Sequence, residues 1–226
     1  MCCFTLRTLS EPRKHRLLLE EPPAQHVDPW SFVELIGATR PLPLSFYSSS
    51  TVDVARSLLG CVLLHHRSAG MVVEVEAYLG SDDQAAHAHR GVTDRTRVIF
   101  GPPGRAYIYF IYGMHECLNV VAEKAGQPGC VLIRALEPLT GLKQMYERRR
   151  WKGSPRGLAN GPGKLTQALG ITREQYGARL DRGDLRLRRW KTLPTFEIAS
   201  TPRIGITHCA DWPLRFIWKG HACLSR

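Results

Sequence analysis

Two glutamates separated by a single residue are the first candidates for chemistry in this sequence. Glu74 and Glu76 lie within residues 71–78, an alternating, β-branched run that predicts a strand. Successive side chains of a strand point to opposite faces, so both carboxylates and Tyr78 are expected on one face. Carboxylates two residues apart lie roughly 7 Å from each other, which leaves room for a water molecule in an inverting hydrolase. A solvated strand face explains the same pair without any chemistry.

Histidines follow in a long segment, residues 80–104, that has no clear hydrophobic periodicity. Loops of this length in a compact domain are usually functional. His87 stands there among acidic and basic residues, which makes it a candidate site residue, whereas a lone histidine is more often a hydrogen-bonded structural residue. His87 and His89 form an HxH pair, but no third histidine or cysteine follows at ligand spacing. We therefore expect no metal site.

An aromatic run at residues 107–114 ends in a turn that contains a glycine. Alternation places Tyr107 and Tyr109 on one face of a strand expected at 106–110, and a core strand explains the apolar residues between them. Tyr112 lies at the expected hairpin tip. A large aromatic side chain projecting from such a tip is suited to enter a base stack as a wedge.

The elements that must position these residues predict a mixed domain. A helix is expected from Thr51, with Ser50 or Thr51 itself as its N-cap, and the strands at 61–64 and 71–78 are expected to form an antiparallel pair. Further strands are expected at 106–110, 117–122, 131–135, 203–207 and 214–218, and helices at 141–150 and 164–169. The charged residues 172–190 show no clear preference.

The first 44 residues differ in composition from the rest. They combine basic residues, an acidic pair at Glu20 and Glu21, and six prolines. Such a segment predicts an extended, poorly ordered tail outside the core. The expected organisation is therefore a tail at 1–44 and one catalytic domain at 45–226.

Composition restricts the class of partner. The chain has 226 residues, of which 43% are hydrophobic and 23% charged; these values are near globular averages and exclude general disorder. Its formal net charge of +11 favours a polyanionic partner. Nucleic acid fits best, an anionic membrane surface is second, and a basic surface kept only for solubility is the third interpretation.

The cysteine content and the hydropathy of the sequence indicate the cellular compartment. The seven cysteines form an odd set without any CxxC pair, several of them in apolar surroundings, which favours reduced thiols in an intracellular compartment. No stretch reaches the ~18 to 20 apolar residues of a membrane span, and charged residues interrupt the N-terminal segment where a signal peptide would be apolar. A soluble, unprocessed protein without membrane contact is expected.

Several motifs in a fixed order resemble the alkyladenine DNA glycosylase family, also called 3-methyladenine or methylpurine DNA glycosylases, over roughly residues 46–220. The motifs are VEVEAY at 73–78, AH at 86–87, FGPPG at 100–104, YIYFIYGM at 107–114, LN at 118–119, LIRALEP at 132–138 and GPGKL at 161–165. The resemblance implies an α/β (α+β) fold, a single domain around a curved antiparallel β-sheet with a protruding β-hairpin that intercalates into DNA.

The same resemblance implies a monofunctional hydrolase of base excision repair. It would flip alkylated or deaminated purines, namely 3-methyladenine, 7-methylguanine, hypoxanthine and 1,N6-ethenoadenine, out of double-stranded DNA and hydrolyse the N-glycosidic bond. No cofactor and no metal are implied. An intracellular monomer associated with DNA is expected, in the cytoplasm or nucleoid of a bacterium or in the nucleus of a eukaryote. Lost pairing makes a damaged base easier to flip, and a positively charged purine also gains from cation–π attraction to aromatic walls.

Individual roles follow from the matched motifs. Glu76 resembles the general base that deprotonates the attacking water. The residues that resemble contacts to the flipped nucleotide are Tyr78, His87 and Tyr109 as stacking walls, Asn119 at the C2 edge of the purine and Arg134 near the nucleotide backbone. Tyr112 resembles the intercalating wedge, and the DNA-binding residues are Arg95, Met114 and Lys164.

One departure and two alternatives accompany this interpretation. Family members commonly carry Thr-Pro-Arg-Asn where residues 93–96 read Thr-Asp-Arg-Thr, so only Thr93 and Arg95 carry over. A nucleoside- or RNA-directed N-glycosyl hydrolase would use the two glutamates without a wedge. A non-catalytic nucleic-acid-binding module would gain nothing from Glu76, because a carboxylate repels phosphate. Substitution of Glu76 separates the classes, because only an enzyme would lose turnover while keeping affinity.

Overall fold

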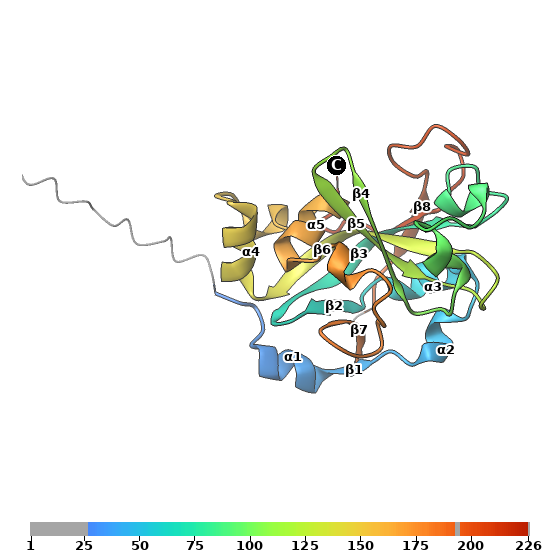
Figure 1. Cartoon of the computed structure of the whole chain (residues 1–226). Helices are drawn as coiled ribbons and strands as arrows, with labels where there is room; N and C mark the ends of the chain where they lie inside the picture. The colour runs from blue at the N-terminus through green and yellow to red at the C-terminus, as the bar shows by residue number, and fades with distance from the viewer. Residues whose placement is uncertain (1–26, 193–194, 226) are drawn as a thin grey trace, which may run out of the picture.

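Strand β3 (Ser68–Tyr78), which carries the two glutamates, is the central strand of the sheet. The computed structural model describes residues 27–192 and 195–225. In that part of the chain nine strands pair in the order β1-β7-β2-β3-β6-β5-β4, with β9 between β3 and β8. All of these pairings are antiparallel. The predicted fold class, a mixed α/β domain built on a large antiparallel sheet, is confirmed (Figure 1).

The elements are as follows. The other strands are β1 (Thr39–Pro41), β2 (Val62–His65), β4 (Ala106–Ile111), β5 (His115–Val121), β6 (Cys130–Thr140), β7 (Leu185–Trp190), β8 (Ile198–Thr201) and β9 (Arg215–Trp218). The α-helices are α1 (Phe32–Ala38), α2 (Leu44–Tyr47), α3 (Thr51–Leu58), α4 (Leu142–Arg149) and α5 (Pro162–Leu169). The 3₁₀ helices are η1 (His87–Arg90), η2 (Arg97–Phe100), η3 (Pro155–Gly157) and η4 (Arg173–Gln175). Within the described ranges no helix is long and apolar enough to cross a membrane.

Helix α3 begins as the sequence predicted. The Ser50 hydroxyl accepts a hydrogen bond from the backbone N–H of Asp53 and so satisfies one of the free donors of the first turn. Its buried face, which includes Val54 and Leu58, packs on β3 and β6. Together with α4 and α5 it covers the main hydrophobic core on one side of the sheet.

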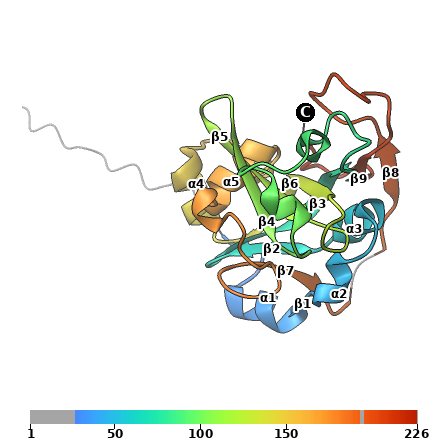
Figure 2. The same ribbon diagram turned by 45° about the vertical axis from the view of Figure 1, so that its right-hand side comes forward.

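Strict alternation gives each of β4, β5 and β6 two different faces. In β5, Leu118 and Val120 point into the main core, whereas Cys117 and Asn119 point to the opposite side. The same division holds for the neighbouring strands. The side away from the main core is covered by the loops around η1 and η2 and by the segment after β8 (Figure 2).

A β-bulge interrupts the alternation of β3. The register against β6 shifts between Val72 and Glu74 and again between Glu74 and Val75. Val72 and Val75 both belong to the main core, whereas Val73 packs in a separate cluster on the other side. Simple alternation, which would place Val73 and Val75 on one face, therefore fails at this point, because a bulge places two successive residues opposite one residue of the partner strand.

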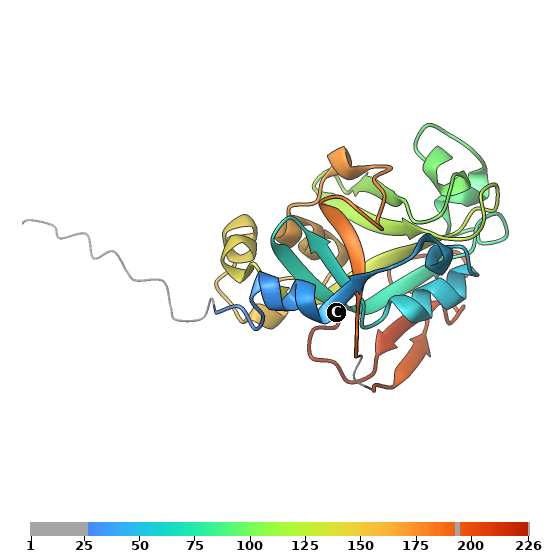
Figure 3. The same cartoon turned by 90° about the horizontal axis from the view of Figure 1, so that it is seen from below.

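The N-terminal part of the described chain differs from the extended tail expected up to residue 44. Leu35 of α1 is fully buried, and β1 pairs with β7 at the edge of the sheet (Figure 3). The Asp28 carboxylate accepts hydrogen bonds from the backbone N–H groups of Gly141 and Leu142 at the start of α4. A proline in an edge strand does not prevent hydrogen bonding on the side that faces the sheet. The proline-rich composition therefore wrongly predicted that this segment lies outside the fold. Residues 1–26 of the expected tail lie outside the described residues.

One further expectation needs correction at the C-terminal end. Residues 203–207 form a loop and not a strand, and the strand β8 precedes them. In this loop the backbone N–H of Ile204 donates to a side chain and not to a neighbouring strand. The charged segment before it contains β7, whose buried Leu185 and Leu187 alternate with arginines.

Strands β4 and β5 form a hairpin whose tip extends beyond the sheet (Figure 2). Ile111 pairs with His115, and residues 112–114 form the tip. The backbone N–H of Met114 donates to the carbonyl of Ile111. This hairpin stands beside the sheet face that carries Asn119.

Candidate active site

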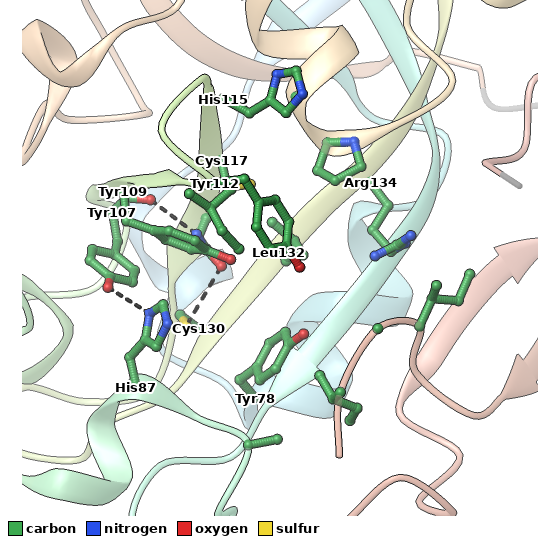
Figure 4. Close-up of a pocket in the computed structure, with 18 residues that line it drawn as sticks. Tyr78, His87, Tyr107, Tyr109, Tyr112, His115, Cys117, Cys130, Leu132 and Arg134 are labelled. Atoms are coloured by element: carbon green, nitrogen blue, oxygen red, sulfur yellow. Dashed lines mark hydrogen bonds between the residues drawn. The ribbon is translucent and has the colours of Figure 1, made fainter. Parts of the chain in front are cut away.

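A pocket of about 380 Å³ opens on the sheet face away from the main core (Figure 4). Alternate residues of three strands form its floor, including Tyr107, Asn119 and Leu132. Loop residues such as His87 and Ile206 close its sides. Its volume and its mixture of aromatic walls with a few polar groups are typical of a small-ligand site.

Glu76 lies directly behind the wall of this pocket. Its side chain is fully buried, so the solvated strand face considered for the glutamates is excluded. One carboxylate oxygen, Oε2, accepts a hydrogen bond from the Tyr78 hydroxyl at 2.9 Å. The other, Oε1, accepts one from the backbone N–H of Ile204 at 2.8 Å and lies 3.3 Å from Nη1 of Arg134. All three partners line the pocket, so the carboxylate is oriented towards it.

Glu74 is held differently. Its Oε1 accepts hydrogen bonds from Arg134 Nε at 2.9 Å, Arg215 Nε at 2.8 Å and the Ser225 hydroxyl at 2.7 Å. Its Oε2 accepts one from the Ser225 backbone N–H at 2.6 Å. Burial acts to raise the pKa of Glu74, but the hydrogen bonds from Ser225 and Arg215 outweigh it and hold this pKa below its usual value. Glu74 is thus an ionised anchor whose oxygens are already occupied.

Arg134 of β6 joins the two glutamates. Burial acts to lower its pKa, but the charges of Glu76 and Glu74 outweigh this and raise the pKa further. The register of β6 against β3 pairs Leu132 with Glu76, which brings the Arg134 side chain between the two carboxylates. The guanidinium therefore remains a cation. Figure 4 shows its position beside the pocket.

Aromatic side chains form the walls. The rings of His87 and Tyr109 meet edge to face, with centroids 4.6 Å apart, and Tyr107 lies next to both. Burial raises the pKa of Tyr78 and of Tyr109, and the Glu76 carboxylate raises that of Tyr78 further. Both phenols are therefore neutral, and their rings offer stacking surface for a flat ligand.

His87 is neutral and its tautomer follows from its partners. Burial, with the nearby charges of Arg95 and Arg90, lowers the pKa of His87 from 6.5 to about 4. Its Nε2 lies 3.3 Å from an Arg95 nitrogen, which can only donate, so Nε2 accepts. The proton of the neutral ring is then on Nδ1, which donates to the Tyr107 hydroxyl oxygen at 2.8 Å.

Asn119 is 2% exposed and lines the pocket. Its amide nitrogen donates a hydrogen bond to the Tyr107 carbonyl at 3.2 Å. This bond fixes the amide plane across the β4–β5 pair. The side chain therefore both ties two strands together and presents a polar edge to the pocket.

Tyr112 occupies a strained position at the hairpin tip. Its φ of 54° and the 67° of Gly113 place both residues in the left-handed region, as in a type I′ turn. A bulky residue rarely adopts this conformation, which costs roughly 1 to 2 kcal/mol. The Tyr112 side chain is 78% exposed and also lines the mouth of the pocket. Strain that presents an aromatic ring to solvent points to a functional role.

The three expected DNA-binding residues lie around the pocket and not in it. Arg95 stacks its guanidinium 5.1 Å from the centroid of Tyr109. Met114 is 69% exposed at the hairpin tip. Lys164 is exposed on α5, where its ammonium donates to Asn160. The seven expected residues Glu76, Tyr78, His87, Tyr109, Tyr112, Asn119 and Arg134, in contrast, converge on the pocket or its wall.

The loop around Arg95 departs from the family motif and is held by side-chain hydrogen bonds. The hydroxyls of Thr93 and Thr96 hydrogen-bond to each other, and each accepts a bond from the other residue's backbone N–H. Asp94, which replaces the usual proline, forms an exposed ion pair with Arg97. A proline restricts the backbone by fixing its own φ. In this loop, side-chain hydrogen bonds to the backbone restrict the conformation instead.

Sequence reasoning missed a buried ion pair that supports the pocket. The side chains of Asp83 and Arg203 are both fully buried, with contacts of 2.5 and 2.9 Å. The Arg203 guanidinium also donates to the Ala77 carbonyl and lies 4.7 Å from the centroid of the Tyr78 ring. The only local signal of this ion pair is Arg203 itself, which lies in a segment with Gly and Pro. A local pattern does not identify a partner 120 residues away.

Metal-ligating side chains do not gather in the described part of the chain, where no group of three or more His, Cys, Asp or Glu could hold an ion. The two histidines of the HxH pair have separate partners. His87 Nδ1 contacts the Tyr107 hydroxyl, and His89 Nδ1 contacts the Ser81 carbonyl.

Comparison with known proteins places the chain in a family. A profile of the methylpurine-DNA glycosylase family matches residues 45–222. Three similar proteins are named "Putative 3-methyladenine DNA glycosylase". The protein of Methanoculleus marisnigri is 51% identical over 191 residues, which cover 82% of this chain and 98% of the relative. That of Rhodopseudomonas palustris is 49% identical, covering 80% and 86%, and that of Koribacter versatilis is 46% identical, covering 82% and 93%. The chain therefore belongs to the methylpurine-DNA glycosylase family and is a monofunctional DNA glycosylase, a hydrolase of N-glycosidic bonds.

Proposed function

We propose that this protein excises alkylated or deaminated purines from double-stranded DNA with Glu76 as its general base. The substrates we propose are 3-methyladenine, 7-methylguanine, hypoxanthine and 1,N6-ethenoadenine. The observation that carries the proposal is a buried carboxylate oriented by three pocket-lining groups, directly behind a pocket with aromatic walls.

The hydrolysis needs one proton acceptor and one leaving group. Glu76 takes a proton from a water molecule while the water oxygen bonds to the anomeric carbon of the flipped nucleotide. The bond from that carbon to the purine nitrogen breaks, and its electron pair leaves with the base. The Arg134 guanidinium contacts Glu76 and lines the pocket, and in this proposal it holds the nucleotide backbone.

The free-energy cost of extruding the base from the duplex has to be compensated. Flipping costs a few kcal/mol of stacking and pairing, and aromatic stacking returns ~1 to 3 kcal/mol for each stacked base. Tyr78, His87 and Tyr109 supply that surface, while Tyr112 fills the gap left in the duplex. The exposed Met114, Arg95 and Lys164 contact the surrounding DNA, in keeping with the positive charge of the chain.

A nucleoside- or RNA-directed glycosyl hydrolase remains the competing function. Such an enzyme has no use for an exposed aromatic residue held at positive φ on a hairpin tip, because a free or single-stranded base needs no wedge. The strained Tyr112 therefore favours a duplex substrate.

The decisive experiment incubates the protein with duplex oligonucleotides that each contain one of the four lesions, followed by alkaline cleavage of abasic sites. We expect strand breaks at the lesion in duplex DNA and little reaction with the same lesion in a free nucleoside or an RNA strand. Equal or faster reaction on the nucleoside would support the alternative. The Glu76→Gln variant serves as the blank for contaminating activities.

We also propose that the protein acts as a monomer on DNA inside the cell. Electrophoretic shifts with one 20-base-pair duplex, together with light scattering of the free protein and the complex, test the stoichiometry. A complex with two protein chains on one lesion would contradict it.

A further inference from the structure

The hairpin that carries Tyr112 is held just below its tip by an arginine from another part of the chain. Arg173, in η4, donates a hydrogen bond from Nε to Oε1 of Glu116 at 3.1 Å. Its guanidinium carbon also lies 4.8 Å from the ring centroid of Phe110, within the range of cation–π attraction. Phe110 and Glu116 are directly opposite each other in the β4–β5 pair. One side chain therefore contacts both strands of the hairpin at the same level.

These contacts lie on the back of the hairpin, away from the pocket. Tyr109 and Ile111 of β4 line the pocket, as do His115 and Cys117 of β5, so alternation directs the side chains between them to the opposite face. On that face the main core reaches only to Ile108 along β4. Beyond this residue, the back of the hairpin relies on contacts from outside the sheet.

The Glu116 carboxylate depends on this arginine. Its side chain is mostly buried, with 16% of its surface exposed. Oε1 accepts the hydrogen bond from Arg173, whereas Oε2 is buried and has no hydrogen-bond partner among the described residues. A carboxylate in this position needs a nearby cation, because an unpaired buried charge is unfavourable. Removal of Arg173 would therefore push Glu116 towards water and disturb the strand pair next to the tip.

The segment that carries Arg173 is itself anchored. The hydroxyl of Tyr176, directly after η4, donates a hydrogen bond to the carbonyl of Arg95 at 3.1 Å. The next residue, Gly177, donates its backbone N–H to the carbonyl of Ala106, where β4 begins, at 2.8 Å. Arg173 therefore reaches the hairpin from a support that is fixed at both the base of β4 and the loop beside the pocket.

The other charged groups near Arg173 are engaged elsewhere. Asp94 and Arg95 line a surface groove together with Arg173. Asp94 forms an ion pair with Arg97, and Arg95 lies over the ring of a pocket wall. Glu116 is therefore the counter-ion of Arg173, and the contact between them joins η4 to the hairpin.

A wedge works only if the hairpin behind it does not bend away. An aromatic ring that enters a base stack is pressed back by the bases that it separates. The pair formed by Phe110 and Glu116 lies next to the tip, so a contact there resists this bending. We propose that Arg173 is a positioning residue, which braces the hairpin against η4 and holds Tyr112 where it fills the gap left by a flipped nucleotide. This inference rests on the proposed function.

The first test removes the brace and compares two duplexes. Arg173→Met keeps an unbranched side chain but removes the charge and every hydrogen-bond donor. Single-turnover excision of hypoxanthine from a stable base pair should fall roughly three- to tenfold, the size expected for losing an exposed ion pair and an exposed cation–π contact. Excision from a mismatch, where flipping is easier, should stay within about twofold of the wild type. Equal losses on both duplexes would overturn the proposal.

Lys219→Met provides the matched control. Lys219 forms an ion pair with Glu197, its side chain is 58% exposed compared with 64% for Arg173, and it does not line the pocket. The variant loses the same charge, so both excision rates should stay within about twofold of the wild type. A selective loss as large as that of Arg173→Met would assign the effect to net charge and would reject the brace.

A double-mutant cycle shows whether Arg173 acts through Tyr112. In the Tyr112→Ala background there is no ring to position, so the addition of Arg173→Met should change the rate on the stable pair by less than about twofold. The same loss in both backgrounds would mean that Arg173 acts independently of the wedge, and the positioning role would be wrong.

A direct contact of Arg173 with a DNA phosphate predicts a different result for its partner. Glu116→Met removes the other half of the brace together with a negative charge. We expect a selective loss on the stable pair, as for Arg173→Met, whereas an Arg173 freed to bind phosphate would make this variant bind DNA more tightly. Tighter binding without the selective loss would overturn the brace. Since Glu116→Met leaves no unpaired carboxylate, it tests the proposal even if Arg173→Met does not fold.

The wild type separates this inference from the proposed function. If it excises hypoxanthine from both duplexes and the two brace variants lose both activities equally, only the role of Arg173 fails. If the wild type excises hypoxanthine from neither duplex, the proposed function fails for this lesion, and the brace fails with it.

Discussion

The Nη1 atom of Arg134 lies 3.3 Å from Oε1 of Glu76, and both side chains are buried beside the pocket. This contact places a guanidinium beside one oxygen of the carboxylate. It also fixes the direction of the carboxylate, since the Tyr78 hydroxyl and the Ile204 N–H hold it from other sides.

Glu76→Gln is expected to remove nearly all base excision while leaving affinity for lesion-containing duplex within a few-fold. The amide is isosteric and keeps the pocket walls, but it cannot accept the proton of the attacking water. Single-turnover kinetics and fluorescence anisotropy on a hypoxanthine duplex measure the two quantities. Excision near the wild-type rate would reject the assignment of the general base.

Glu74→Gln is expected to lower the free energy of unfolding by about 3 kcal/mol, because it leaves buried cations short of a counter-charge. Excision should fall less than in Glu76→Gln, because Glu74 only positions Arg134. Urea denaturation at pH 7 measures the stability, and Glu197→Gln, in an exposed ion pair with Lys219, should change it by less than about 1 kcal/mol. If Glu74→Gln abolished excision in a stable protein while Glu76→Gln did not, the two roles would be reversed.

The stability contributed by Glu74 should also depend on pH. Its folded pKa lies below the usual 4.5, so the unfolded chain binds more protons in the acid range. The contribution is present above pH 4.5 and is lost as the pH falls through the folded pKa. The difference in unfolding free energy between wild type and Glu74→Gln should therefore shrink in acid. A difference that grows towards low pH would contradict the ionised state of Glu74.

The ring of His87 should stay neutral through the physiological range and titrate with a midpoint of about 4. Because this pKa is below that of the unfolded chain, the stability it contributes is present above pH 6.5 and is lost as the pH falls through about 4. NMR of the ring carbon-bound protons reports the midpoint. Arg95→Gln should raise it, since the Arg95 charge is one cause of the shift. A midpoint above 6 in the wild type would show that His87 is protonated in the site.

Tyr112→Ala should weaken capture of a stably paired lesion more than that of a mismatched, easily flipped one. A wedge holds the flipped state open but does not touch the bond that breaks. The comparison uses excision rates for hypoxanthine in a stable pair and in a mismatch. Val33→Ala, which truncates an equally exposed residue on α1, is the control and should change neither rate. Equal losses on both substrates would argue against the wedge.

Asn119→Ala should raise excision of guanine mismatched with thymine, and of 7-methylguanine, relative to hypoxanthine. Guanine carries an amino group at C2 where hypoxanthine carries hydrogen, and steric discrimination of this kind is worth ~1 to 3 kcal/mol. Loss of the bond to the Tyr107 carbonyl should also lower stability by about 1 kcal/mol. A lowered melting temperature with an unchanged rate ratio would mean that Asn119 only ties the two strands together.

The sequence by itself determined the local geometry of the site. Period-two alternation correctly placed Tyr107 and Tyr109 on one face of β4, and Glu74 and Glu76 on one face of β3. A glycine in an aromatic run predicted the turn at Tyr112. These features depend only on the repeat of a strand and on which residues tolerate positive φ, so a few neighbouring residues are enough to predict them.

Only the tertiary structure decided which glutamate lies against the pocket. The register of β6 against β3 and the bulge in β3 bring Arg134 between the two carboxylates, and segments far along the chain then supply different partners, Ile204 for Glu76 and Ser225 for Glu74. Alternation treats the two glutamates alike, because it contains no information about contacts over more than a hundred residues. Their distinct environments arise from packing and register, which depend on the whole chain.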